Sequence, residues 1–293
     1  MSDSTMYQLK GILQYNIDGS QNTRETRFHS LRRFIDHMQQ NRGYPTHWDL
    51  HRLGKKELHR YVHDLKAKGL AHRTIENNLK DIRWLASKVG RADQMLSNRE
   101  CGLKQRVFSF ENKAVQLTPH FLEQMTYRMQ LINRLKFEFG LREKEALKFG
   151  YQYATAKEGF LRMKGNWCKN GRSRVIEIVN DRQVQLLKEV GEFQKAQGDY
   201  SMIPHDIKFS TYRNYVQEKS KELGFKGHGL RHAWAHERFK QLAGFDCPIA
   251  GGSEYKDLTT EEKERWDFAA GRVNQELGHG KNRLDTTATY IGA

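Results

Sequence analysis

The sequence predicts a mainly helical protein with one small β-sheet, built as an N-terminal helical bundle followed by a larger α+β domain. From about Thr26 to Arg91, apolar residues recur at steps of three and four, the period of a helix with one buried face. Between Phe160 and Val179, two short apolar runs flank a polar stretch that contains glycine, which is typical of a β-hairpin. Helical periodicity then resumes. Because a domain takes roughly 100 to 200 residues, a chain of 293 residues is expected to hold two.

The N-terminal domain is predicted to span residues 1–91. Its first helical segment places Phe28, Leu31 and Phe34 on one face. The second and third segments end at Gly69 and Gly90, and glycine commonly closes a helix because it adopts the left-handed conformation that a helix end requires. The outer faces of these helices are rich in arginine and lysine, so we expect a basic helical bundle.

Residues 92–116 are predicted to form a basic linker, because they show no sustained period and contain Lys104, Arg106 and Lys113. The second domain is expected to span residues 117–293. It should begin with a helix, since Thr118-Pro119 has the residue types of an N-cap and a first helical position. Later in this domain, Thr259 and Glu262 have the spacing of a capping box before another helix.

The charge balance indicates a polyanionic partner. Fifty Lys and Arg against 35 Asp and Glu give a formal net charge of +15, and nucleic acid is the first such partner to consider. A merely basic surface would give the same net charge, because charge governs association rather than chemistry. The function must therefore be argued from motifs.

The cysteines and the hydropathy favour a protein of the reducing cytoplasm. Cys101, Cys168 and Cys247 lie far apart, which suggests neither a disulfide framework nor a cysteine-based zinc finger. No apolar stretch approaches the length of a membrane span, and the first ten residues lack the apolar region of a signal peptide. No membrane partner is expected.

Two segments of the second domain could handle phosphate. In Gly140-Leu141-Arg142, the arginine is followed three residues later by Glu145, which can hold its guanidinium from the same helical face and orient it toward a phosphate. Lys169 lies near the turn of the predicted hairpin, where a lysine can contact DNA or protonate a leaving oxygen. Lys164, Arg172 and Arg174 are alternatives for that role. Taken alone, the Arg142 segment is better explained as a surface helix with ordinary charge pairs, and the lysine is explained at least as well as part of a solvated basic turn.

Three histidines raise the question of a metal. His228, His232 and His236 are spaced by four residues in a predicted helix, so they share one face and could ligate zinc. No glutamate follows the first histidine as in the His-Glu-x-x-His motif, and a helix rises about 6 Å over four residues, which separates the three rings. We predict no metal and no cofactor.

A tyrosine near the end of the sequence is a candidate nucleophile. Tyr290 lies in Thr287-Ala288-Thr289-Tyr290, after Leu277-Gly278-His279. A phenol, with a reference pKa near 10, needs nearby cations to favour its phenolate form. An isolated tyrosine is more often half-buried packing, so its role depends on the residues that surround it.

The ordered set of motifs resembles the tyrosine recombinase, or phage integrase, family. The set consists of Gly-Leu-Arg, a hairpin lysine, His-x-Leu-Arg-His, Leu-Gly-His and Thr-x-x-Tyr, between Gly140 and Tyr290. The likeness covers nearly the whole chain, because the helical unit also resembles a domain of this family. The resemblance implies that residues 1–91 are a DNA core-binding domain and residues 117–293 a catalytic domain. A stretch of about residues 244–272 departs from the family pattern as an insertion. We expect it to pack against the active site or to contact a neighbouring subunit.

The resemblance also implies a role for each motif residue. Arg142 and Arg231 would bind the scissile phosphate, Lys169 would protonate the departing 5′ oxygen, and Tyr290 would be the nucleophile. The remaining motif residues would bind the phosphate or move the proton of the nucleophile (His228 and His279) or support the site (Glu145 and His232). On the third predicted helix, Arg73, Asn77 and Lys80 share one face, which we expect to contact DNA.

The implied function is site-specific DNA recombination through a 3′-phosphotyrosine intermediate, such as the integration or excision of a mobile element. The implied partners are double-stranded DNA recombination sites, further copies of this chain in a homotetramer, and accessory DNA-bending proteins. The implied location is the nucleoid of a bacterial or phage system. Two alternatives remain. A type IB topoisomerase would share the nucleophile and the basic charge, and a DNA-binding protein without catalysis would need neither the lysine nor the tyrosine.

Overall fold

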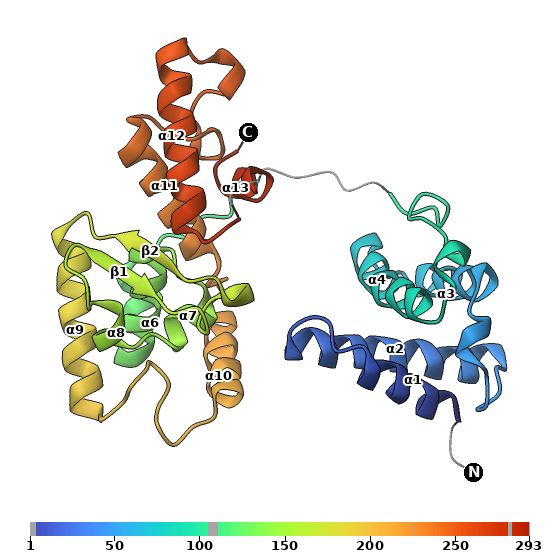
Figure 1. Cartoon of the computed structure of the whole chain (residues 1–293). Coiled ribbons are helices and arrows are strands. Elements are labelled where there is room, and N and C mark those ends of the chain that lie inside the picture. Colours follow the sequence, from blue (N-terminus) through green and yellow to red (C-terminus); the bar gives the residue numbers. More distant parts are fainter. Residues whose placement is uncertain (1–3, 105–110, 225, 281–282, 293) are drawn as a thin grey trace. The chain divides into compact units, whose positions relative to one another are not determined.

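The computed structural model describes residues 4–104, 111–224, 226–280 and 283–292. The chain divides into two compact units, Met1–Val107 and Phe108–Ala293, each of which is described here by itself (Figure 1). Both units are mainly helical, and the described residues contain a single two-stranded sheet. The predicted fold class is therefore confirmed. In the part of the chain that the structure describes, no helix is long and apolar enough to cross a membrane.

The N-terminal unit is a helical bundle with a continuous apolar core. The core is formed by one face of each long helix, for example Leu31 and Phe34 from the second and Leu79 and Ile82 from the fourth. The first helix has only two buried residues, and the sequence analysis did not predict it. The elements are α1 (Ser4–Tyr15), α2 (Gln21–Arg42), a 3-10 turn (Leu50–Arg52), α3 (Lys55–Ala67), α4 (His72–Lys88) and a second 3-10 turn (Ala92–Gln94).

The segment predicted as a linker is shorter than residues 92–116. Leu96, Cys101 and Leu103 are buried in the core of the N-terminal unit, and Arg83 donates from Nε to the carbonyl of Leu96 at 3.0 Å. Single apolar residues can anchor a stretch of chain to a core even where the stretch has no hydrophobic period, so its packing could not be predicted from periodicity. Residues 105–110 lie outside the described residues.

In the C-terminal unit, the two-stranded sheet buries one face and exposes the other. The predicted hairpin is present, with Phe160 opposite Glu177 and Met163 opposite Arg174 in an antiparallel register. The elements are α5 (Pro119–Glu123), α6 (Tyr127–Phe139), α7 (Glu143–Leu147), α8 (Tyr151–Ala154), β1 (Phe160–Met163), β2 (Arg174–Glu177), α9 (Asp181–Gln197), α10 (Phe209–Glu222), α11 (Gly229–Ala243), α12 (Thr260–Glu276) and α13 (Leu284–Ile291), with 3-10 turns at Lys169–Gly171, Pro248–Ala250 and Tyr255–Asp257.

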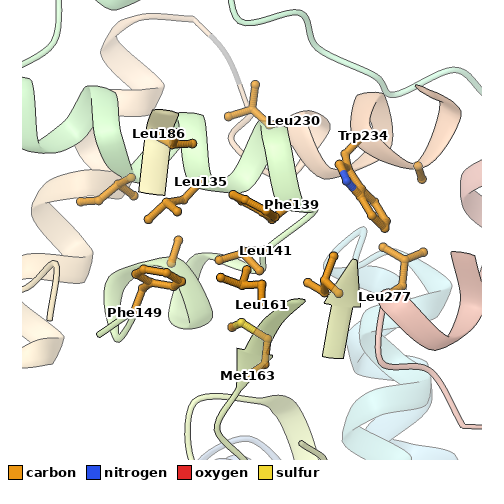
Figure 2. Close-up of a cluster of buried hydrophobic side chains, with 14 of the residues drawn as sticks. Leu135, Phe139, Leu141, Phe149, Leu161, Met163, Leu186, Leu230, Trp234 and Leu277 are labelled. Atoms are coloured by element: carbon orange, nitrogen blue, oxygen red, sulfur yellow. The ribbon is translucent and has the colours of Figure 1, made fainter. Parts of the chain in front are cut away.

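The core of this unit lies between α6, the hairpin and α11 (Figure 2). Phe139 and Leu141, on either side of the glycine that ends α6, are fully buried in it, as is Leu230 at the start of α11. Gly140 adopts a left-handed conformation with φ 59°, and a Cβ at this position would lie 2.4 Å from the ring of Trp234. Only glycine fits there, so the packing of α6 against α11 determines where the chain turns into α7.

The insertion at residues 244–272 consists of two 3-10 turns and most of α12. Its predicted capping box is present, because Thr259 Oγ1 accepts the backbone N–H of Glu262 and Glu262 accepts that of Thr259. In Figure 1, α12 runs beside α11. Pro248 packs against Gly292, where a Cβ would lie 2.8 Å from the proline ring. The insertion thus contacts the end of α13, the helix that carries Tyr290.

Candidate active site

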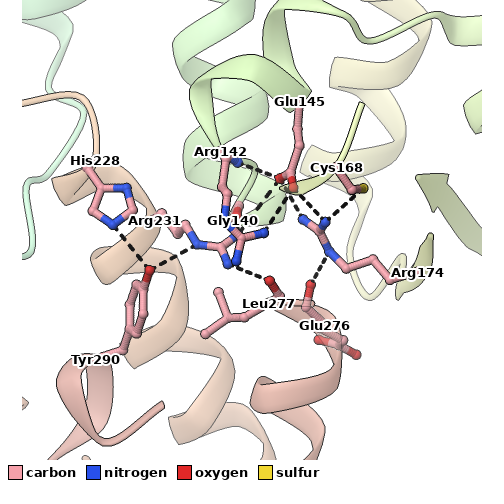
Figure 3. Close-up of polar contacts among 10 residues, drawn as sticks. All are labelled: Gly140, Arg142, Glu145, Cys168, Arg174, His228, Arg231, Glu276, Leu277 and Tyr290. Carbon is pink, nitrogen blue, oxygen red and sulfur yellow. Dashed lines mark hydrogen bonds and ion pairs between the residues drawn. The ribbon is translucent and has the colours of Figure 1, made fainter. Parts of the chain in front are cut away.

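A buried carboxylate, Glu145, lies among three arginines (Figure 3). Its two oxygens accept hydrogen bonds from Nη1 and Nη2 of Arg174, each at 2.8 Å. Arg142 donates its backbone N–H to Oε2 at 2.7 Å and Nη1 to Oε1 at 3.0 Å. Nη1 of Arg231 lies 3.9 Å from Oε2. We call these four residues the Glu145 cluster.

The Glu145 cluster carries excess positive charge. Burial by itself would raise the pKa of Glu145, but the hydrogen bonds and charge of Arg174, with the charges of Arg231 and Arg142, outweigh it and lower the pKa to about 2. The carboxylate is therefore ionised at neutral pH. Three guanidinium groups minus one carboxylate leave a charge of +2 in the cluster. Such an excess, fixed in a buried site, is suited to bind an anion.

Arg231 connects the cluster to the candidate nucleophile. It is 1 % exposed, and its Nη1 and Nη2 donate to the backbone carbonyls of Gly140 and Leu277, the latter at 2.5 Å. Its Nε donates to the hydroxyl of Tyr290 at 3.4 Å. Burial lowers the pKa of Arg231 to about 10, so the guanidinium remains charged at neutral pH. Because both carbonyls follow helix ends, at α6 and α12, the packing of those helices determines where this charge lies.

Tyr290 is buried and held on several sides. It is 6 % exposed, and its hydroxyl lies 3.2 Å from Nε2 of His228. The ring of His232 stacks on the Tyr290 ring, with centroids 4.3 Å apart and planes at 25°. Nε2 of His236 donates to the backbone carbonyl of Tyr290 at 2.7 Å. The side chain and the backbone of the tyrosine are therefore both positioned by α11.

The histidines around Tyr290 are neutral. Burial, followed by the charges of Arg231 and Arg142, lowers the pKa of His228 to about 4. Burial, followed by the neighbouring histidines, lowers the pKa of His232 to about 3. A neutral imidazole has one nitrogen that accepts a hydrogen bond, so each ring can take up a proton.

The spacing of the three histidines, one at the N-cap of α11 and two within it, serves the tyrosine. His228 contacts the Tyr290 hydroxyl, His232 its ring and His236 its backbone. The three rings have different partners, and among the described residues no group of three or more His, Cys, Asp or Glu side chains is arranged to hold a metal ion.

His279 follows the end of α12 and faces the same tyrosine, with ring centroids 5.6 Å apart. Its Nδ1 lies 2.9 Å from Oγ1 of Thr287. Burial, followed by the charges of Arg231, Arg142 and Arg174, lowers the pKa of His279 to about 3. Five of the six residues predicted to be catalytic therefore lie together in this unit: Arg142, His228, Arg231, His279 and Tyr290.

Lys169, the sixth, lies apart from these contacts. It is exposed in the 3-10 turn between β1 and β2, beside Asn170, which has a left-handed backbone with φ 61°. Of its alternatives, Lys164 places Nζ 5.5 Å from the ring centre of Tyr153. Arg174 is buried in the Glu145 cluster. The conformation of this exposed turn therefore determines where Lys169 lies relative to Tyr290.

Several residues of the site were not predicted from the sequence. Arg174 was expected only as an alternative to Lys169, although its guanidinium makes the closest side-chain contacts to Glu145. His236 was expected only as a metal ligand. Asn274 and Thr287 were assigned no role, although both are buried beside His279. The one available signal was the spacing of His236, four residues beyond His232 on the same helix.

In the N-terminal unit, the predicted DNA-contacting residues lie on the exposed face of α4. Arg73, Asn77 and Lys80 are all exposed, opposite the buried Ile75 and Leu79. We call these three residues the α4 basic face. Among the described residues, Arg73 of this face forms an ion pair with Glu76 at 3.1 Å.

Comparisons with known proteins agree with this architecture. Residues 3–95 match the family model of the phage integrase N-terminal domain. No curated protein matches the chain. The whole fold is similar to that of a lambda integrase dimer bound to a COC′ core site, with a TM-score of 0.60 and 16 % identity over 96 % of this chain and 75 % of that one.

Two further solved structures are similar to the same extent. The XerH site-specific recombinase bound to a palindromic difH substrate has a TM-score of 0.59 and 15 % identity, over 98 % of this chain and 80 % of that one. The Tn1549 transposon integrase in complex with transposon right end DNA has a TM-score of 0.58 and 15 % identity, over 100 % of this chain and 95 % of that one. The resemblance to the tyrosine recombinase, or phage integrase, family is therefore confirmed, by sequence for residues 3–95 and by fold for the chain as a whole.

Proposed function

We propose that this protein is a site-specific DNA recombinase that cleaves and rejoins DNA strands through a 3′-phosphotyrosine intermediate. The observation that carries the proposal is the hydroxyl of Tyr290, which lies between Nε2 of His228 at 3.2 Å and Nε of Arg231 at 3.4 Å. A phenol between a neutral base and a fixed cation is arranged to lose its proton.

The hydrogen-bond donors and acceptors around the Tyr290 hydroxyl identify the general base. The guanidinium of Arg231 can only donate, so the oxygen of Tyr290 accepts from it. The hydroxyl hydrogen needs an acceptor, and among the recorded contacts of this hydroxyl Nε2 of His228 is the one atom that can accept. His228 is neutral because its pKa is lowered to about 4. We assign it as the general base for the nucleophile.

The Glu145 cluster is the proposed phosphate site. The side chain of Arg142 is 22 % exposed and is oriented by Glu145, so it can reach a non-bridging oxygen while it remains anchored. Arg231 supplies a second charge beside the attacking oxygen. The pentacoordinate transition state gains negative charge on its oxygens, and fixed cations stabilise that charge more than they stabilise the ground state.

The reaction balances without a redox step. The hydroxyl of Tyr290 gives its proton to His228, its oxygen forms a bond to phosphorus, and the bond between phosphorus and the 5′ oxygen breaks. Lys169 is the proposed donor of the proton that converts this oxygen into a 5′ hydroxyl. The phosphodiester energy is kept in the phosphotyrosine, so the reverse attack by a 5′ hydroxyl of another strand joins it to a new partner.

The proposed substrate is double-stranded DNA with specific sites. The solved structures that share this fold include a lambda integrase tetramer bound to a Holliday junction and a transposon integrase bound to transposon DNA. The net charge of +15 and the α4 basic face suit such a substrate. By this analogy we propose that residues 1–91 bind the core of the site, that residues 117–293 catalyse, and that a homotetramer, with or without DNA-bending partners, integrates or excises a mobile element.

One assay tests the chemistry. A duplex carrying a candidate site is nicked beside the scissile position, so that a short fragment is lost on cleavage and the covalent adduct accumulates. We expect an adduct with the unsubstituted protein and none with Tyr290→Phe. Absence of an adduct on every candidate site, from protein that binds DNA, would support the reading of a DNA-binding protein without catalysis. Relaxation of supercoiled DNA that lacks any site would instead favour a topoisomerase.

A further inference from the structure

A chain of hydrogen bonds connects His279 to two buried side chains. Nδ1 of His279 lies 2.9 Å from Oγ1 of Thr287, and this oxygen lies 2.8 Å from Oδ1 of Asn274. Thr287 is fully buried and Asn274 is 3 % exposed, so water does not take the place of either contact. Asn274 belongs to α12 and Thr287 to α13, the helix of Tyr290.

The amide of Asn274 has one orientation that satisfies both of its neighbours. Its Nδ2 donates to the backbone carbonyl of Gly280 at 3.2 Å. A reversed amide would set Oδ1 against that carbonyl, two acceptors with no hydrogen between them. Oδ1 therefore faces Thr287. Because a carbonyl oxygen cannot donate, the hydroxyl of Thr287 must donate to Asn274.

This donation determines which nitrogen of His279 carries the hydrogen. A threonine hydroxyl has a single hydrogen, and that of Thr287 is used for Asn274. Its contact with Nδ1 of His279 is then a hydrogen bond that the hydroxyl accepts, so Nδ1 carries the hydrogen. The ring is neutral at neutral pH, since its pKa is lowered to about 3. A neutral ring has one N–H, which leaves Nε2 with a free lone pair.

We propose that Thr287 and Asn274 are positioning residues that hold His279 as its Nδ1–H tautomer and present Nε2 to the site as an acceptor. This inference rests on the proposed function, and it assigns the sequence of events at His279. The ring first accepts a hydrogen bond or a proton, and it donates to a phosphate oxygen only after it has been protonated. Before DNA binds, Arg142 and Arg231 are therefore the donors of the phosphate site.

The tautomer can be measured without DNA. In the full chain with ¹⁵N-labelled histidine, long-range ¹H–¹⁵N correlation spectra distinguish the two ring nitrogens, and His279→Gln assigns the signals. We expect a protonated Nδ1 in the unsubstituted protein and in Thr287→Ser, which keeps the hydroxyl. In Thr287→Val, which has the same shape without the hydroxyl, the signals should shift toward the Nε2–H form. Thr289→Val is the matched control, because among the described residues the Thr289 hydroxyl donates within its own helix, to the carbonyl of Thr286.

An Nε2–H tautomer in the unsubstituted protein, or an unchanged tautomer in Thr287→Val, would overturn the inference. The adduct assay supplies the functional readout. In metal sites, removing the outer partner of a ligating histidine lowers activity by about 10- to 100-fold. Because Thr287 holds His279 in a comparable way, we expect a loss of the same order in Thr287→Val and recovery in Thr287→Ser. An altered tautomer with an unchanged rate of adduct formation would refute the positioning role. If the unsubstituted protein forms no adduct, the proposed function fails while the tautomer measurement still stands.

Discussion

The Glu145 cluster and the α4 basic face present positive charge in opposite ways. In the cluster, Arg174 and Arg231 are almost fully buried, and each guanidinium is anchored by hydrogen bonds to a carboxylate or to backbone carbonyls. On α4, Arg73 and Lys80 are solvated, and the one recorded ion pair is exposed on its arginine side, where that side chain is 65 % accessible. The effect of a buried charge depends on its particular contacts, so a charge at another position cannot replace it. Surface charge acts through number and distance, and salt screens it.

The largest effect is expected from removing the charge at the centre of the cluster. Glu145→Gln keeps the shape but leaves buried guanidinium groups without a counterion, and breaking a buried ion pair from one side costs about 3–5 kcal/mol of unfolding free energy. Urea denaturation measures this loss, and the adduct assay should show no product.

Glu143→Gln is the matched control for this substitution. Glu143 pairs with the half-exposed Arg213, so its loss should change the unfolding free energy by about 1 kcal/mol or less. Equal effects of the two substitutions would contradict the distinction between buried and surface charge.

The stabilisation that Glu145 provides should depend on pH. The pKa of Glu145 is lowered in the folded protein, so its contribution to the unfolding free energy is present above the ordinary glutamate pKa of about 4.3 and is lost as pH falls toward 2.

Lys169 is exposed, but we expect its loss to have a large and specific effect, unlike the loss of other surface charges. If it protonates the 5′ oxygen, Lys169→Ala should slow adduct formation by at least about 10²-fold. A substrate with sulfur in place of that oxygen has a leaving group that needs no proton, so it should restore the rate. If Lys164→Ala shows this pattern and Lys169→Ala does not, the general acid is Lys164.

A smaller effect, on the pH dependence of the unfolding free energy, is expected from replacing His232, a neutral histidine of the site. The pKa of His232 is lowered to about 3, so the unfolded chain binds a proton near pH 6.5 that the folded chain does not. The unfolding free energy should therefore fall as pH falls from about 6.5. In His232→Phe, which keeps the ring that stacks on Tyr290, the slope should decrease by up to about 1.4 kcal/mol per pH unit. An identical slope in both proteins would show that His232 is protonated in the folded state.

The smallest effect is expected on α4. Replacing Arg73 and Lys80 by alanine should leave the unfolding temperature nearly unchanged, because both side chains are exposed. If both contact phosphates, the slope of log binding constant against log salt should become shallower by about 0.9 for each. Replacing Lys55 and Lys56, two exposed lysines on α3, by alanine is the charge-matched control. A slope that changes equally in the control would show that the α4 basic face has no special role.

Much of the fold was predictable because periodicity is a local property. The buried faces of α2, α3 and α4, the β1–β2 hairpin and the capping box before α12 all follow from residue spacing. The first helix and the anchoring of Leu96 and Leu103 were missed, because a few isolated apolar residues give no period. Their place depends on a core that other segments build.

The site was predictable as a set of residue types and only partly as a set of contacts. Motif order singled out Arg142, Arg231 and Tyr290, which lie together in the structure. The closest side-chain partner of Glu145 is Arg174, which lies on β2, 29 residues further along the chain. No spacing rule connects them, because the hairpin register and the position of α7 decide the contact.

By itself, the sequence determined the class of fold, the basic character and the residue types of a phosphate site, because these depend on composition, local periodicity and the order of short motifs. The tertiary structure alone decided which arginine holds Glu145, which histidine faces the Tyr290 hydroxyl and which tautomer Thr287 and Asn274 impose on His279. Hydrogen bonds depend on distances of about 3 Å and on direction. Those are set only when helices far apart in the chain pack against one another.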